Sequence, residues 1–282
     1  SRNTSVGTNA GNYGTWSGAT DNTVIGYDPG TAITSGDFNT GVDKDALKAL
    51  TTGGTNTALG VDALTANTTA SSNTAIGCGS MEDNSTGQYN TAIGQDSLHA
   101  NTTASNNTAV GRQALDANTT GASNVAIGID ALGANTTASY NIAIGSEALL
   151  TNTTGANNVS IGAQALKANT TASYNTAVGS NCLAGNTTGT GNVAVGHDVM
   201  EASNADYCTG VGFEAMKSLD GGASNTAVGV NALFSVTTGT QNTAVGRYAG
   251  DAITTGDYNT AMGINALTNC TTSNKNLSLI HI

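Results

Sequence analysis

A repeat with a period of 17 restricts the fold of this chain more than any other feature. Asparagine opens the unit at Asn22, and steps of 17 lead from there to Asn192; Cys208 follows after a step of 16, and Asn225 resumes the longer step. A period this short is typical of a solenoid, in which one repeat forms one coil and stacks on the next. We number the places of the unit from 1 to 17, starting at this asparagine.

The composition favours a folded chain over a disordered one. Disordered chains combine low hydrophobicity with high charge, whereas here 38% of residues are hydrophobic, only 10% are charged, and the apolar residues recur on the period. With a net charge of −11 and only eight basic residues, the chain is not expected to bind nucleic acid. No apolar run is long enough to insert into a membrane.

Places 2 to 5 predict a short strand that ends at a corner. Places 2 and 4 carry Thr, Val, Ile or Leu, so these mostly β-branched residues, two apart, predict the inward face of the strand. Place 3 is then expected to point outward, and glycine at place 5 suits a corner with positive φ. The outward alanine column of place 3 is Ala58, Ala75, Ala92, Ala109, Ala126 and Ala143.

A second strand is expected around place 9, where leucine recurs as a core column from Leu64 to Leu183. Place 12 is asparagine in the middle coils and aliphatic in others, such as Leu50 and Val236, which indicates that it points inward. Stacked asparagines can then bond along the column as an amide ladder. The competing interpretation is a row of glycosylation sites, because Asn67-Thr68-Thr69 and its equivalents fit the N-x-[ST] pattern.

Places 11 and 13 are expected to point outward and to form a flat surface poor in charge. A continuous small apolar stripe often marks an interaction surface, so these two columns and the place 3 alanines are the candidate interface residues. The columns of places 11 and 13 are Ala66, Thr68, Ala100, Thr102, Ala117, Thr119, Ala134, Thr136, Thr153, Ala168, Thr170 and Thr187.

Place 7 carries carboxylates in many coils, which raises a calcium column as one hypothesis. The column is Asp28, Asp45, Asp62, Asp96 and Asp130. Gln113 and Asn181 stand at the same place in other coils, and an amide accepts hydrogen bonds from turn amides better than it binds calcium. We therefore favour a turn-capping role, and no other cofactor is expected.

Three segments follow from the pattern. Residues 1–21 are predicted to be an irregular N-terminal coil or cap, with Tyr13 and Trp16 closing the open end. Residues 22–275 hold the repeats, with a loosened stretch over 192–222 that we interpret as a damaged coil rather than a contact site. Residues 276–282 are expected to be a degenerate coil or an artefact, since LSLIHI matches the translation of a common sequencing adapter.

The sequence thus predicts an all-β fold, a single parallel β-solenoid of about 15–16 coils, in which each coil is one 17-place unit with two short strands. The strands Asn107–Gly111 (NTAVG) and Asn124–Gly128 (NVAIG), with the small-residue turns that follow, resemble the head repeats of trimeric autotransporter adhesins. They also resemble repeat-built tail-fibre proteins of bacteriophages, and the resemblance covers Asn22 to about Asn274. It implies a left-handed β-roll, a homotrimer, and an extracellular binding rod on a cell or virion surface.

No catalytic constellation is apparent, because the three histidines have no Cys or carboxylate partner at a suitable spacing. We expect a non-enzymatic structural or adhesive fibre segment that contacts a host-surface glycan or protein through repeated weak contacts. The alternative is an ice-binding solenoid that uses the outward Ala and Thr of places 11 and 13. The mass in solution distinguishes these two hypotheses. A trimer favours the fibre, whereas a monomer with thermal hysteresis favours ice binding.

Overall fold

The computed structural model describes residues 2–11 and 16–279, in two compact units, Ser1–Tyr140 and Asn141–Ile282. All regular secondary structure in the described residues is β-strand, and no helix occurs among them. The first unit holds β1 (Thr4–Val6), β2 (Thr23–Ile25), β3 (Thr40–Val42), β4 (Thr57–Leu59), β5 (Thr74–Ile76), β6 (Thr91–Ile93), β7 (Thr108–Val110) and β8 (Val125–Ile127). The second unit holds β9 (Ile142–Ile144), β10 (Val159–Ile161), β11 (Thr176–Val178), β12 (Val193–His197), β13 (Thr209–Phe213), β14 (Thr226–Val228), β15 (Thr243–Val245), β16 (Thr260–Met262) and β17 (Leu277–Leu279).

Within each unit, consecutive strands pair in parallel, each with the strand of the next coil. The usual step between paired residues is 17, as from Thr57 to Thr74. The first step is longer, 19, from Thr4 to Thr23, and one step in the second unit is shorter, 16, from Val193 to Thr209. The chain therefore forms a parallel β-solenoid of about 16 coils of about 17 residues, which confirms the predicted fold class.

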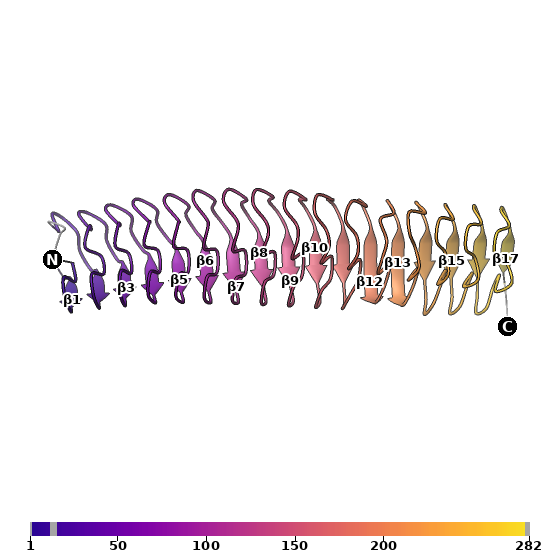
Figure 1. Ribbon diagram of the computed structural model, residues 1–282, viewed down its shortest axis with the longest axis horizontal. Helices are drawn as coiled ribbons and strands as arrows, with labels where there is room; N and C mark the ends of the chain where they lie inside the picture. Colours follow the sequence, from indigo (N-terminus) through magenta and orange to yellow (C-terminus); the bar gives the residue numbers. More distant parts are fainter. Residues whose placement is uncertain (1, 12–15, 280–282) are drawn as a thin grey trace. The chain divides into compact units, whose positions relative to one another are not determined.

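Each coil contains one strand, so the expectation of two strands per coil is wrong. Figure 1 shows a single arrow per coil, followed by a loop that leads to the next arrow. Around place 9 the chain runs through turns, because places 7 and 9 both adopt left-handed backbone, as at Asp96 (φ 52°) and Leu98 (φ 53°). The Leu98 N–H still donates to the next coil, at Ala114 O (2.9 Å), which keeps the turns stacked.

The strand faces the opposite way from the sequence prediction. The place 3 alanines are fully buried, whereas the aliphatic residues of place 4 are exposed or half-buried. The reason lies at place 1: its asparagine is buried, and alternation along a strand then turns place 3 inward and places 2 and 4 outward. The correction applies to the whole column of Ala58, Ala75, Ala92, Ala109, Ala126 and Ala143.

Two asparagine ladders run through the core. At place 12, Asn101 Nδ2 donates to Asn84 Oδ1 (2.7 Å) and Asn118 Nδ2 to Asn101 Oδ1 (3.0 Å), so the predicted ladder is confirmed. At place 1, the backbone N–H of Asn107 donates to Asn90 Oδ1 (2.9 Å) in the preceding coil. Because the place 12 asparagines are fully buried, their sequons are not accessible to glycosylation in the folded chain.

The two ladders meet at the backbone carbonyl of place 15. Gly121 O accepts Nδ2 of Asn107 (2.9 Å) and Nδ2 of Asn118 (3.0 Å) from the same coil. Each of these side-chain amides therefore forms hydrogen bonds within its own coil and to a neighbouring coil. Polar groups that are buried away from water need such hydrogen-bond partners.

The coil that lost one residue, which we call the shortened coil, is repaired by a side chain. In a regular coil, Thr119 N and Thr120 N donate to the Thr136 carbonyl of the next coil (2.9 and 3.2 Å). At the shortened coil, Asn204 Oδ1 takes that position and accepts from Thr187 N, Thr187 Oγ1 and Thr188 N at 2.8, 2.8 and 3.2 Å.

Both ends of the described chain continue the pattern. Asn3 occupies place 1, because its Oδ1 accepts from Asn22 N (2.8 Å). Trp16 is half-buried and donates from Nε1 to Gly11 O (2.8 Å), whereas Tyr13 lies outside the described residues. At the other end, β17 pairs with β16 at the usual step, Thr260 with Leu277.

Candidate interaction surfaces

The outer face of the strands carries an aliphatic column. Every place 4 residue of the described strands is Val, Ile, Leu or Met, and many are markedly exposed, such as Leu59 (45%), Ile93 (38%) and Val228 (38%). Place 2, beside it, is Thr, Val, Ile or Leu. No charged residue occurs at places 2 to 4 of the described strands. We call the columns of places 2 and 4 the sheet face.

The candidate columns of places 11 and 13 lie outward, in the turns that follow the strands. Their alanines and threonines are half-buried or exposed, Ala117 and Thr68 among them. The threonine hydroxyls are used within the solenoid: Thr119 Oγ1 donates to Thr136 O (3.0 Å), and Thr102 Oγ1 to Thr119 O (3.2 Å). These hydroxyls therefore contribute to cohesion between coils.

The place 7 carboxylates face lysine or arginine in several coils. Asp45 receives Lys44 Nζ (2.6 Å) and Lys48 Nζ (2.9 Å), and Asp130 lies 3.4 Å from Arg112. Burial raises the pKa of Asp45, but hydrogen bonds from both lysines outweigh it, and the net pKa is lowered. No group of three or more His, Cys, Asp or Glu side chains that could hold a metal ion occurs in the described part of the chain.

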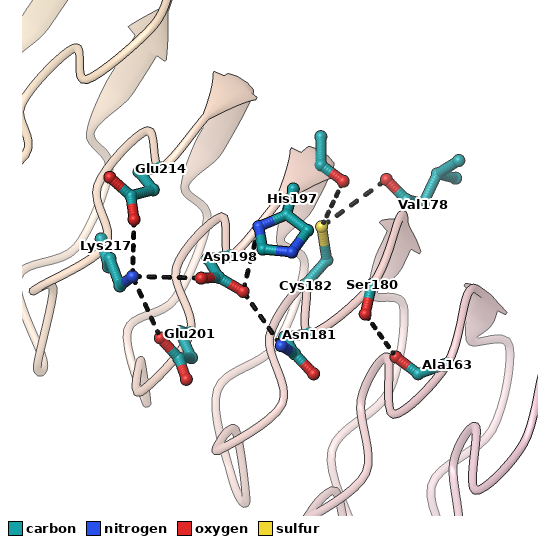
Figure 2. Close-up of polar contacts among 11 residues, drawn as sticks. Ala163, Val178, Ser180, Asn181, Cys182, His197, Asp198, Glu201, Glu214 and Lys217 are labelled. Carbon is teal, nitrogen blue, oxygen red and sulfur yellow. Dashed lines mark hydrogen bonds and ion pairs between the residues drawn. The ribbon is translucent and has the colours of Figure 1, made fainter.

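A denser polar cluster lies at the shortened coil (Figure 2). Lys217 Nζ bonds Glu214 (2.7 Å) and Asp198 (3.0 Å), with Glu201 at 3.8 Å, and Asn181 Nδ2 donates to Asp198 (3.0 Å). Burial raises the pKa of Asp198, while the bonds from Asn181 and Lys217 lower it and prevail. The bonds to Glu214 and Asp198 raise the pKa of Lys217.

Next to this cluster, β12 and β13 are longer than the other strands and hold a stacked pair. The rings of His197 and Phe213 lie parallel, with centroids 5.5 Å apart and an interplanar angle of 9°. Cys182, nearby, is buried with Sγ 3.3 Å from Gly196 O, and burial raises the pKa of its thiol. The ion pairs and the stacked pair fix the corner at the shortened coil, which is a structural role.

A row of exposed aromatic rings occupies place 17 and is not among the surfaces predicted from the sequence. Their exposed fractions run from 54% at Tyr258 to 69% at Tyr174 and Tyr207. The signal was present in the sequence, because each ring directly precedes the residue of place 1. We call this set the aromatic row; it consists of Phe38, Tyr89 and Tyr140 in the first unit and Tyr174, Tyr207 and Tyr258 in the second.

Comparison with known proteins adds no family: no protein-family model matches the chain, and no curated protein matches it either. Among the described residues there is no helix of the length and apolarity that crossing a bilayer requires.

Proposed function

We propose that the chain is a segment of an extracellular structural or adhesive fibre and that it assembles as a homotrimer through its sheet face. The observation that carries this proposal is the aliphatic column of place 4. It has no polar interruption in either unit, from Val6 to Ile127 in the first and from Ile144 to Leu279 in the second, and its residues are exposed or half-buried. Soluble monomers rarely expose a contiguous apolar patch of this extent.

A symmetric homo-oligomer is the simplest way to cover such a column. Identical copies present the same regularly spaced column, so side chains of neighbouring copies meet at the same height along the coils. The uncharged sheet face has no like-charge repulsion to prevent this contact. The resemblance to trimeric adhesin heads and phage tail fibres supports three copies, a non-enzymatic role and an extracellular location.

Adhesion in this proposal depends on repetition. The remaining surface offers Thr, Asn, Ser and Gly with few charges, and similar polar groups recur in most coils. Many weak contacts along one rod give avidity without a single pocket. A host-surface glycan or protein is the class of partner that we propose.

The mass in solution tests the assembly. We expect sedimentation or light scattering to give a mass three times that of one chain. Ile93→Lys combined with Val228→Lys places a charge in the sheet face of each unit, and we expect these substitutions to yield monomers. Gln95→Lys is the matched control, because Gln95 is exposed at the adjoining corner, outside the sheet face. A monomeric parent chain contradicts the proposal.

Ice binding remains the second candidate, and one observation favours it. Threonine occupies place 2 in six consecutive coils, from Thr23 to Thr108, one coil apart beside the aliphatic column. This alternative moves from places 11 and 13 to the sheet face, because the place 13 hydroxyls donate to neighbouring coils. The second candidate is supported over the fibre if the chain is a monomer, shows thermal hysteresis, and loses this hysteresis on Thr74→Lys.

A further inference from the structure

We propose that the aromatic row binds an extended, uncharged polysaccharide by stacking of sugar rings on its exposed side chains. The inference rests on the proposed adhesive function, for which it names the class of partner. It requires no particular oligomeric state, because the row lies at place 17, outside places 2 and 4 that form the sheet face.

The concentration of aromatic residues at one place is the first observation. The chain contains one Trp, eight Tyr and three Phe, and five of the tyrosines and one phenylalanine stand at place 17. All six have left-handed backbone, with φ between 58° and 64°. Bulky residues adopt this conformation at a cost that Gly or Asn avoids, so a row of rings there is not explained by local folding preference.

The backbone beneath each ring is held in place. The N–H of Tyr89 donates to Ser71 O (3.3 Å) in the preceding coil, and the N–H of Tyr258 donates to Thr240 O (3.0 Å). Before two of the rings, Tyr258 and Tyr174, the preceding residue adds a side-chain bond: Asp257 Oδ1 accepts from Thr240 N (2.7 Å), and Ser173 Oγ from Ala156 N (3.0 Å). The rings therefore project from a rigid edge, which lowers the entropy lost on binding.

The rings are spaced in whole coils. In the first unit, Phe38, Tyr89 and Tyr140 are three coils apart, about 14 Å at the usual spacing of parallel strands. In the second unit, Tyr174 and Tyr207 are two coils apart, and Tyr258 follows three coils later. One coil rise is close to the length of one pyranose in an extended chain, so successive rings can meet sugars of the same strand.

The places between the rings suit a hydroxyl-rich ligand. Thr55, Ser72, Asn106 and Ser123 occupy place 17 in the first unit and have polar side chains, of which the Thr55 and Ser72 hydroxyls bond each other (3.0 Å). In the second unit, Gly191 leaves space for its neighbour: a Cβ on Gly191 would lie 2.8 Å from Cδ1 of Tyr207. The Tyr207 ring thus leans along the coils over a bare backbone while 69% of the residue stays exposed.

Charge disfavours a polyanionic partner. The chain carries a net charge of −11, and lysine occurs at place 17 only at Lys275, so the row does not attract a polyanion. A second copy of this chain fits less well, because separated rings with polar residues between them do not form a continuous apolar surface. An amphipathic ligand with apolar C–H faces and polar edges matches this alternation.

Affinity electrophoresis tests the proposal, with hydroxyethyl cellulose, galactomannan and xylan as the probes. The variants are F38S/Y89S/Y140S, Y174S/Y207S/Y258S and their combination; the chain itself carries Ser at place 17 in Ser72 and Ser224, so these variants should fold. We expect at least one polysaccharide to retard the parent chain. Each triple variant should weaken the interaction, and the combination should lower it by roughly tenfold or more.

Tyr27→Ser is the matched control, because Tyr27 is similarly exposed (53%) but stands at place 6, where Ser146 and Ser180 occur in other coils. This control should bind as the parent does. The proposal is overturned if none of the three polysaccharides retards the parent chain, or if the combined variant binds equally well. It is also overturned if the variants lower the mass in solution and leave retardation unchanged, which would make the row a contact between copies. A trimer that binds no polysaccharide defeats this inference and leaves the fibre assembly intact.

Discussion

A Cβ atom on Gly30 would lie 2.8 Å from Cγ1 of Val24, across the core of a single coil. Val24 is at place 3, where most coils have alanine, and Gly30 is at place 9, where most have leucine. In this coil a larger residue at place 3 compensates for a smaller residue at place 9. The next coil shows the reverse arrangement, with Gly41 opposite Leu47, and a Cβ on Gly41 would lie 3.2 Å from Cδ1 of Leu47. Each coil therefore has a fixed internal volume that places 3, 9 and 12 share.

This compensation predicts a strong coupling between the two positions. Gly30→Leu alone should overpack the coil and cost about 1–3 kcal/mol. Val24→Gly alone should leave a cavity and cost a similar amount, about 2 kcal/mol. The combination copies Gly41 and Leu47, so it should cost clearly less than the sum. A double-mutant cycle from denaturant unfolding measures the coupling, and simple additivity of the two costs refutes the shared-volume argument.

Asp43 is a local weak point, and replacing it should stabilise the protein. It occupies place 5 with φ 101°, where neighbouring coils have glycine, as at Gly60 (φ 135°). Asp43→Gly should raise the free energy of unfolding by about 1 kcal/mol, because the strain is removed. Gly94→Asp is the opposite test: a Cβ there would lie 2.5 Å from Gly111 O, so this change should destabilise strongly. A melting temperature unchanged by D43G shows that the strain is absent.

The part of the fold that could be predicted from the sequence is the part that periodicity alone determines. The period determined the coil and the stacking, and the columns of Leu64 at place 9 and Asn67 at place 12 identified buried positions. The orientation of the strand could not be predicted from periodicity. With Thr, Ala and Val at places 2 to 4, the sequence suggests that the larger residues at places 2 and 4 are buried. Hydrogen bonding of Asn107 at place 1 overrides that preference and buries Ala109.

Two further features could not be predicted from the conformational propensities of the residues. Leucine rarely adopts left-handed backbone, so the turn at Leu98 looked like a strand. The aromatic row was visible as a column, but its exposure depends on how place 17 leaves the corner, which only the folded coil determines. The candidate surfaces consequently changed from the alanines of place 3 to the aliphatic column of place 4 and the rings of place 17.

The middle of the place 12 ladder should be sensitive to a change of one atom. Asn118 Nδ2 donates to Asn101 Oδ1 (3.0 Å) and Gly121 O (3.0 Å). Asn118→Asp replaces this donor by an acceptor and buries a charge, so we expect a loss of about 3–5 kcal/mol. Asn106→Asp adds the same charge at an exposed position and should change stability by less than about 0.5 kcal/mol. Equal effects of the two substitutions in thermal unfolding contradict a structural ladder.

Asn204 should be required for the stability of the shortened coil. Its Oδ1 accepts three hydrogen bonds from Thr187 and Thr188. Asn204→Ala leaves two backbone donors without their acceptor, and we expect a loss of about 1–3 kcal/mol, together with faster hydrogen exchange at the amides of Thr187 and Thr188. Thr188→Ala keeps the backbone donor and serves as the control. Unchanged exchange at these two amides shows that water replaces Asn204 without cost.

Lys217 should make part of the free energy of unfolding depend on pH in the acidic range. Burial acts to raise the pKa of Asp198 in the folded chain, but hydrogen bonds from Asn181 and Lys217 outweigh it, so this pKa lies below its ordinary value. A lowered carboxyl pKa stabilises the fold above the unfolded pKa, about pH 4, and this contribution is lost as the pH falls through the folded pKa. Lys217→Met should therefore raise the pKa of Asp198, lower stability at pH 7 and flatten the loss of stability below about pH 4. Lys275→Met, outside this cluster, is the control. NMR titration of Asp198 with denaturant unfolding at several pH values measures both effects, and parallel pH profiles for the parent and K217M disprove the coupling.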